Sequence, residues 1–191
     1  MIDLIDSALK DLKTRKQSEF IDHEKLVMAT FSIALPKQSK TLNTNLIKKI
    51  FSIDEELNLI LVGHLYLEKL LNGILTENLK GFEILDKRGV LNSFYKKIMF
   101  LKSEQITPNQ ILDDLLIFNQ LRNMYAHELN YNIADFDIFK LSFLKKYASS
   151  FQIKRRSNKR ILNRILVRHS IFHLLLKLTS THSYLHLIDE K

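Results

Sequence analysis

The sequence predicts an all-α protein in one domain, residues 1–191, and three observations lead to this prediction. Apolar residues recur at steps of three and four along several segments, which is the period of one helix face. Only four Gly and two Pro occur among 191 residues, which leaves little material for the tight turns of sheets. Hydrophobic residues make up 46% and charged residues 26%, the balance of a globular chain rather than a disordered one.

The N-terminal part predicts two amphipathic helices, over residues 2–16 and Asp22–Leu35, followed by a loop over 36–45 that is rich in turn-forming residues. Ser52 and Glu55 have the spacing of a capping box. They predict the start of a long helix over about 53–79, with Gly81 as its stop.

The second half predicts four more helices. Val90–Lys102 has apolar residues on one face, and Thr107–Gln110 has the cap, proline and Gln pattern of a helix start. The helix that begins there continues to Leu121 and beyond. Phe136–Tyr147 and a basic segment of about 155–187 are also predicted to be helical, and no segment predicts a strand.

The formal net charge is +8 and the isoelectric point about 9.5, and a run without acids carries much of the excess. Such a block attracts polyanions, so RNA or DNA is the expected partner. A solvated helix face and a docking surface for an acidic protein are the alternatives. Arg160, Arg164 and Arg168 step by four and form one row. The block consists of Lys154, Arg155, Arg156, Lys159, Arg160, Arg164 and Arg168.

Several features point to the cytoplasm. The chain has no Cys, so it has neither disulfides nor thiolate metal ligands. The N-terminus lacks the basic start and apolar core of a signal peptide. We found no apolar run near the ~20 residues that cross a bilayer, so no membrane partner is expected.

The stretch Leu121–Glu128, LRNMYAHE, places a fixed cation and a titratable imidazole at the end of an apolar helix. Arg122 and His127 are about 140° apart around a helix, whereas Asn123 and His127 share a face. This is either a well-satisfied helix end, where the dipole favours His, or a site that cleaves phosphodiesters.

Three segments together resemble the HEPN superfamily, a group of helical-bundle proteins that includes many metal-independent RNA endonucleases. Residues 118–129, FNQLRNMYAHEL, resemble its Arg-x4-6-His signature. Residues 67–71, LEKLL, and 89–98, GVLNSFYKKI, resemble the helices that precede this signature in the mannitol operon repressor branch. The resemblance covers roughly residues 54–140, and places a HEPN-like core at about 54–150 within an antiparallel bundle that has extra N-terminal and C-terminal helices.

The resemblance implies a homodimer in which both copies of the motif line one cleft. It makes Arg122, Asn123 and His127 the expected catalytic residues, with Glu68, Tyr125 and Tyr131 as substrate-binding or supporting residues. HEPN toxins paired with nucleotidyltransferase antitoxins usually carry Tyr two positions after the His, where this chain has Leu129 and its nearest Tyr is Tyr131.

The chemistry of RNA cleavage fits these residue types. Imidazole can act as the base for the 2′-hydroxyl or the acid for the leaving oxygen. A guanidinium group makes a bidentate contact with phosphate and stabilises the charge that develops on it. Glu68 could pair with Arg122 inside the bundle, where a lone carboxylate would be costly, and His64 is expected to be a satisfied core histidine.

The C-terminal helix carries the pairs His169 with His173 and His182 with His186. The spacing of four can hold a metal, but a third ligand is missing, so no metal and no cofactor are expected. Ile171–Leu178 is apolar on nearly every side, which predicts burial between subunits or against the bundle.

The function expected is that of a HEPN-type, metal-independent endoribonuclease in a toxin-like, defence or regulatory setting, with RNA as substrate and a regulatory or antitoxin protein as a further partner. The alternative is a non-catalytic regulator resembling the mannitol operon repressor, which binds RNA, DNA or protein through its basic helix.

Overall fold

The prediction of an all-α chain is confirmed for the part of the chain that the structure describes. The computed structural model describes residues 49–50, 52–128, 131–150 and 156–182, together with Ser7, Lys10 and Asp11. Within these ranges the elements are α-helices and short 3-10 helices, with no strand. The helices predicted over 2–16 and Asp22–Leu35 and the loop over 36–45 fall almost wholly outside the described residues.

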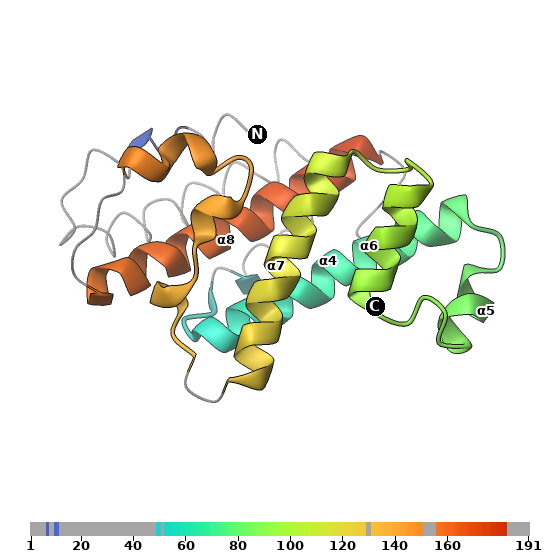
Figure 1. Cartoon of the computed structure of the whole chain (residues 1–191), viewed down its shortest axis with the longest axis horizontal. Helices are drawn as coiled ribbons and strands as arrows, with labels where there is room; N and C mark the ends of the chain where they lie inside the picture. Colours follow the sequence, from blue (N-terminus) through green and yellow to red (C-terminus); the bar gives the residue numbers. More distant parts are fainter. Residues whose placement is uncertain are drawn as a thin grey trace.

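The central element is α4, Glu56–Asn78, which contacts α5, α6, α7 and α8 (Figure 1). Its buried side chains include Leu59, Leu67 and Ile74, each with no exposed surface. Gly63 lies against α8 so closely that a Cβ atom there would stand 2.5 Å from Cδ1 of Ile171. The two helices therefore cross at a point where only glycine leaves room for this isoleucine.

The start of α4 corrects the predicted capping box. Glu55 is itself the N-cap, and no side chain caps the helix. The hydroxyl of Ser52 instead donates to the carbonyl of Lys49 at 2.9 Å, and the Glu55 carboxylate accepts from the Asn58 amide. Ser52 has helical backbone of its own, so it cannot adopt the extended conformation that a cap requires.

A short helix that the sequence did not predict, α5 at Phe82–Lys87, follows α4. Gly81 precedes it with a φ of 81°, a conformation that favours glycine. α6 then spans Phe94–Ser103, with the Ser93 hydroxyl accepting from the amide of Lys96. The helix predicted from Val90 thus begins four residues later, because Ser93 caps it.

α7, Asn109–His127, crosses both α4 and α8 (Figure 1). Its N-cap is Pro108 rather than the predicted Thr107. The Thr107 hydroxyl is buried and lies 3.0 Å from Nε2 of His182, so it is engaged by the end of α8. The helix ends at His127, with Glu128 as its C-cap.

The helix predicted over Phe136–Tyr147 is wrong. Residues 133–150 form three 3-10 helices, η2 at Ile133–Asp135, η3 at Ile138–Lys140 and η4 at Lys145–Ser150, and the last two replace the predicted helix. The side-chain amide of Asn163 in α8 donates to the carbonyls of Ile133 and Phe136 at 2.7 and 3.0 Å. At the start of this segment a neighbouring helix therefore satisfies backbone carbonyls that an α-helix would otherwise satisfy.

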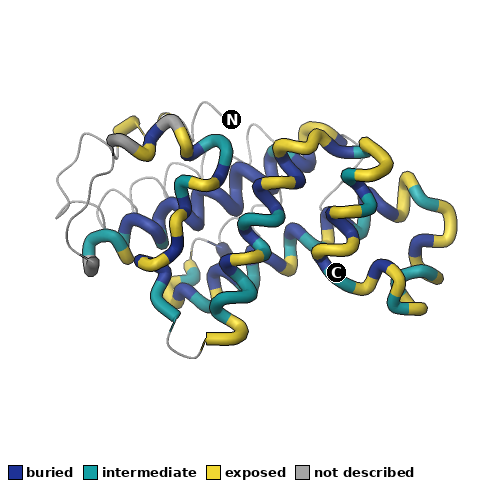
Figure 2. Tube along the Cα trace, in the orientation of Figure 1, coloured by how far each residue is buried: buried dark blue, intermediate teal, exposed yellow. Residues whose placement is uncertain are grey.

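α8, Arg156–Thr181, is buried along most of its length (Figure 2). In the segment Ile171–Leu178 every residue except Lys177 is buried. Of the two places expected for this apolar segment, the structure shows burial within the chain itself. The segment therefore gives no reason to expect a dimer.

α4 is also long and apolar enough to cross a membrane, with a mean hydropathy of 1.3 over its most apolar window. Half of this window is buried inside the fold. Leu65 is the largest exposed apolar side chain of this helix, at 64% of its surface, in the described part of the chain.

Candidate nucleic-acid site at the end of α7

The last turns of α7 carry Arg122, Asn123 and His127. Nη1 of Arg122 donates to Oδ1 of Asn123 at 3.2 Å, and both side chains are half-buried. Nε of Arg122 is buried and has no hydrogen-bond partner in the described part of the chain. The guanidinium is therefore oriented by its neighbour while keeping donor capacity for another group.

His127 lies at the exposed end of the same helix. Within the described residues no hydrogen bond or ion pair joins its ring to Arg122 or Asn123. This agrees with the helix geometry, which separates Arg122 and His127 by about 140° around the axis. One copy of the chain thus presents the guanidinium and the imidazole on different faces.

A buried contact from α4 supports the Arg122 side of the helix. Nε2 of His64 lies 3.2 Å from Oδ1 of Asn119, one turn before Asn123, and the ring stands 4.1 Å from that of Phe94. Burial lowers the pKa of His64, and the positive charge of Arg122 lowers it further, against the raising effects of Asn119 and Glu68. The ring is therefore a largely buried, satisfied histidine, as the sequence suggested, but it faces the candidate site.

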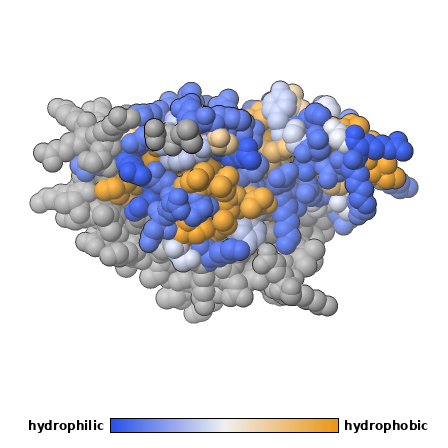
Figure 3. All heavy atoms as spheres, turned by 90° about the horizontal axis from the view of Figure 1, so that it is seen from below, coloured by the Kyte–Doolittle hydropathy of each residue, from blue (hydrophilic) through white to orange (hydrophobic). Residues whose placement is uncertain are grey.

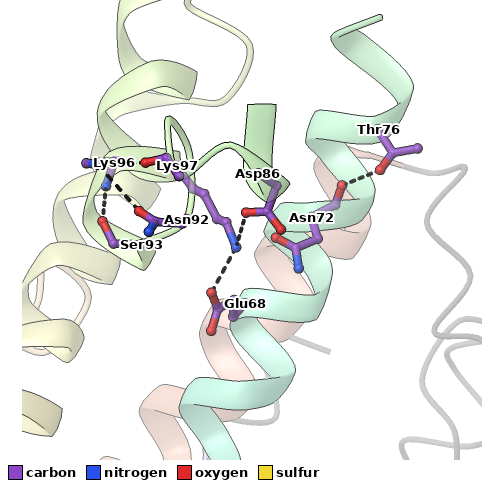
Figure 4. Close-up of polar contacts among 9 residues, drawn as sticks. Glu68, Asn72, Thr76, Asp86, Asn92, Ser93, Lys96 and Lys97 are labelled. Atoms are coloured by element: carbon purple, nitrogen blue, oxygen red, sulfur yellow. Dashed lines mark hydrogen bonds and ion pairs between the residues drawn. The ribbon is translucent and has the colours of Figure 1, made fainter. Parts of the chain in front are cut away.

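Glu68 does not form the expected pair with Arg122. Its Oε1 lies 2.9 Å from Nζ of Lys97 in α6, a lysine whose side chain is 4% exposed. Oδ1 of Asp86 in α5 lies 3.5 Å from the same ammonium (Figure 4). A buried ammonium needs a carboxylate partner more than a half-exposed guanidinium does, so Glu68 supports the packing of α4 against α5 and α6.

Tyr125 connects the site helix to α4 and α8. Its hydroxyl donates to Oε2 of Glu56 at 2.9 Å, and Nε of Arg160 donates to Oε1 of the same carboxylate at 2.6 Å. Burial and the Glu56 carboxylate raise the pKa of Tyr125. The ring also packs edge-on against Tyr131, with the ring centroids 5.0 Å apart. Tyr125 is held as a neutral hydrogen-bond donor, with its ring against Tyr131.

The basic row does not present three arginines to solvent. Arg168 is 1% exposed, and its Nη2 donates to the carbonyl of Ile53 at 2.6 Å. Burial lowers its pKa to about 10. The prediction that Arg168 binds nucleic acid is therefore wrong, because the side chain is enclosed between α8 and the residues before α4.

The remaining basic residues of this segment differ in accessibility. Arg160 has a side chain 57% exposed but held by Glu56, whose hydrogen bond and charge raise the pKa of the guanidinium. Lys159 and Arg164 are half-buried. Arg156 begins α8, its side-chain burial is not described, and Lys154 and Arg155 lie outside the described residues.

The histidines of α8 that were considered as metal ligands contact protein groups instead. Nδ1 of His169 lies 2.7 Å from the carbonyl of Ile165, and His173 stacks on Phe143. His186 lies outside the described residues. No group of three or more His, Asp or Glu residues that could hold a metal is found in the described ranges.

Comparisons with protein-family models, with curated proteins and with solved structures found no match for this chain. Function is therefore inferred from the residues and contacts above, together with the resemblance in the sequence. Asn119 is the residue at this site that sequence reasoning missed, since a single amide within a helix has no distinctive spacing.

Proposed function

We propose that the chain is a metal-independent endoribonuclease of the HEPN type, whose site lies at the C-terminal end of α7. The observation that carries this proposal is the state of Arg122. Its guanidinium is oriented by Asn123, lies within electrostatic reach of His64, and keeps a buried Nε without a partner. Such an arginine is prepared to bind an anion such as a phosphodiester.

The roles follow from the chemistry of each group. Arg122 binds the scissile phosphate and stabilises the charge that develops on it. His127, exposed at the helix end, exchanges a proton with the 2′-hydroxyl or the leaving 5′-oxygen. Asn123 keeps the guanidinium in place.

A second copy of the chain completes the site in this proposal. Because Arg122 and His127 lie on different faces of one helix, a two-fold dimer would bring the His127 of one protomer towards the Arg122 of the other. Sedimentation at micromolar concentration should then give about twice the mass of one chain. A monomer at all concentrations that still cleaved RNA would contradict the shared site.

Purified protein tests the activity directly. Wild type should cleave single-stranded RNA in the presence of EDTA, and His127→Ala should lower the rate at least ~10²-fold, the usual contribution of a general acid or base. Lys69→Ala, an exposed change on α4, is the matched control and should keep full activity. Equal cleavage by wild type and His127→Ala would reveal a contaminating nuclease.

The second candidate function is a non-catalytic regulator that binds nucleic acid or an acidic protein. The exposure of Arg160 favours it, as does the lack of any contact between His127 and Arg122 within one chain. This candidate predicts salt-dependent RNA binding without cleavage, and binding that is unchanged by His127→Ala.

A further inference from the structure

A cavity of about 300 Å³ lies at the other end of α7 from His127. Gln110 and Ile111 of α7, Phe143 after η3, and His173, Leu174 and Lys177 of α8 are among the residues that line it. Gln110 and His127 are seventeen positions apart in one helix, so the cavity is roughly 25 Å from the proposed RNA site. It is a separate feature of the molecule.

Among the described residues that line this cavity, Lys177 is the one Lys, Arg, Asp or Glu. Its side chain is half-buried and makes no ion pair or hydrogen bond with any residue that the structure describes. His173 precedes it by one turn on the same face of α8. A half-buried ammonium with no carboxylate beside it among the described residues attracts an anion from solution.

The two carboxylates of α7 that follow Gln110 and Ile111 in sequence are already engaged. Asp114 accepts from the amide and the hydroxyl of Ser142 at 2.7 and 2.5 Å. Asp113 pairs with Lys102, with Oδ1 2.7 Å from Nζ. Neither residue is among the described lining residues, although Asp114 lies behind the wall through its contacts with Ser142. Neither forms an ion pair with Lys177 in the described part of the chain.

The walls of the cavity suit an apolar body attached to the anion. Ile111 and Leu174 are buried core residues that reach the cavity. The Phe143 ring stacks on His173 with centroids 4.0 Å apart and planes at 11°, which fixes one flat wall. Apolar walls with a few convergent polar groups are typical of sites for small organic ligands.

We propose that this cavity binds a small organic anion, a carboxylate or phosphate group on a compact aromatic or aliphatic body. The anionic group contacts Lys177, and the body lies against Ile111, Phe143 and Leu174. The first turn of α7 also lies here without a side-chain cap, so the positive end of its dipole adds to the attraction.

Titration of the full chain with benzoate and phenyl phosphate, followed by two-dimensional NMR, tests the proposal. Both anions should shift the backbone amides of Ile111, Phe143 and Lys177, whereas benzyl alcohol should bind at least tenfold more weakly. Lys177→Gln should weaken binding of both anions at least about tenfold, as expected for loss of a charge-assisted contact. Lys69→Gln, which removes the same charge from α4, should leave binding unchanged.

Two results would contradict the proposed anion site. If neither anion shifts these amides, or if Lys177→Gln and wild type bind with equal affinity, the cavity is not an anion site. Lys177→Arg, which keeps the charge, should retain most of the affinity in a folded protein. A loss equal to that of Lys177→Gln would show that the ammonium does not bind the ligand.

Discussion

At the scale of single residues, burial decides what the basic and titratable side chains of this chain can do. Arg160 and Arg168 belong to one row of α8 in the sequence, yet Arg160 has a side chain 57% exposed and Arg168 is 1% exposed. The first can reach a polyanion, while the second donates to the carbonyl of Ile53 inside the fold. Arginine therefore lies at the surface in one turn of α8 and in the core two turns later.

Arg168→Ala should lower the free energy of unfolding by about 3 kcal/mol, because it opens a cavity and leaves the Ile53 carbonyl without its donor. Arg160→Ala removes a side chain that is 57% exposed, and the Glu56 carboxylate keeps the Tyr125 hydroxyl as a donor, so the loss should be smaller, about 1 kcal/mol. Chemical denaturation of both variants measures the difference. A similar loss of unfolding free energy in both variants would mean that Arg168 contributes no more to stability than Arg160.

His64 should make stability depend on pH. Burial lowers its pKa in the folded state below the ordinary value of 6.5, so the unfolded chain takes up the proton more readily. The stability linked to the neutral ring is present above pH 6.5 and is lost as the pH falls towards the folded-state pKa. The gap in unfolding free energy between wild type and His64→Gln should narrow from pH 7.5 to pH 5. A constant or widening gap would exclude this linkage.

At the scale of elements, the contacts of α4 organise the described part of the bundle. Gly63 lets α8 approach at Ile171, and the Glu68 carboxylate joins α4 to the ammonium of Lys97 in α6. Asp86 brings α5 to the same ammonium (Figure 4). These contacts join α4, the helix that carries His64, to α8 and to the Lys97 cluster of α5 and α6.

Because Lys97 has two carboxylate partners, we expect the effects of removing them on stability to be non-additive. Glu68→Ala leaves Asp86 as a partner for the buried ammonium, and Asp86→Ala leaves Glu68. The double variant removes both and leaves a buried charge unpaired. It should therefore cost at least about 1 kcal/mol more than the two single changes added together. A double-mutant cycle by urea unfolding measures this coupling, and simple additivity would show that the two carboxylates act independently.

At the scale of the whole molecule, helical periodicity predicted the long elements but not their packing. The helices at α4, α7 and α8 were predicted because each has a long apolar stripe. The 3-10 segments over 133–150 were not; at their start the amide of Asn163, distant in sequence, satisfies the carbonyls of Ile133 and Phe136. Exposed Arg160 and buried Arg168 have the same spacing pattern, so only the folded chain distinguishes them.

In the candidate site too, the sequence predicted residues that are close in the chain but not contacts between helices. Its Arg122, Asn123 and His127 stand in one contiguous stretch, which made them visible in the sequence. Asn119 and its contact with His64 join α7 to α4 across 55 positions, and no local pattern encodes such a contact.

The surface of the molecule carries both polar and apolar side chains. The face in Figure 3 shows hydrophilic and apolar areas, and Leu65, Tyr95 and Met99 are among the exposed large apolar residues of the described chain.

The measurement that tests the central claim most directly is the identity of the ends that the protein leaves on a defined RNA oligonucleotide in EDTA. Attack by the 2′-hydroxyl leaves a 2′,3′-cyclic phosphate or a 3′-phosphate and a free 5′-hydroxyl, and mass spectrometry distinguishes these ends. Wild type should give them, Arg122→Gln and His127→Ala should give almost no product, and a 2′-deoxy substitution at the cleaved position should abolish cleavage there. Products with 5′-phosphate ends, or identical products from wild type and both variants, would contradict the proposed function.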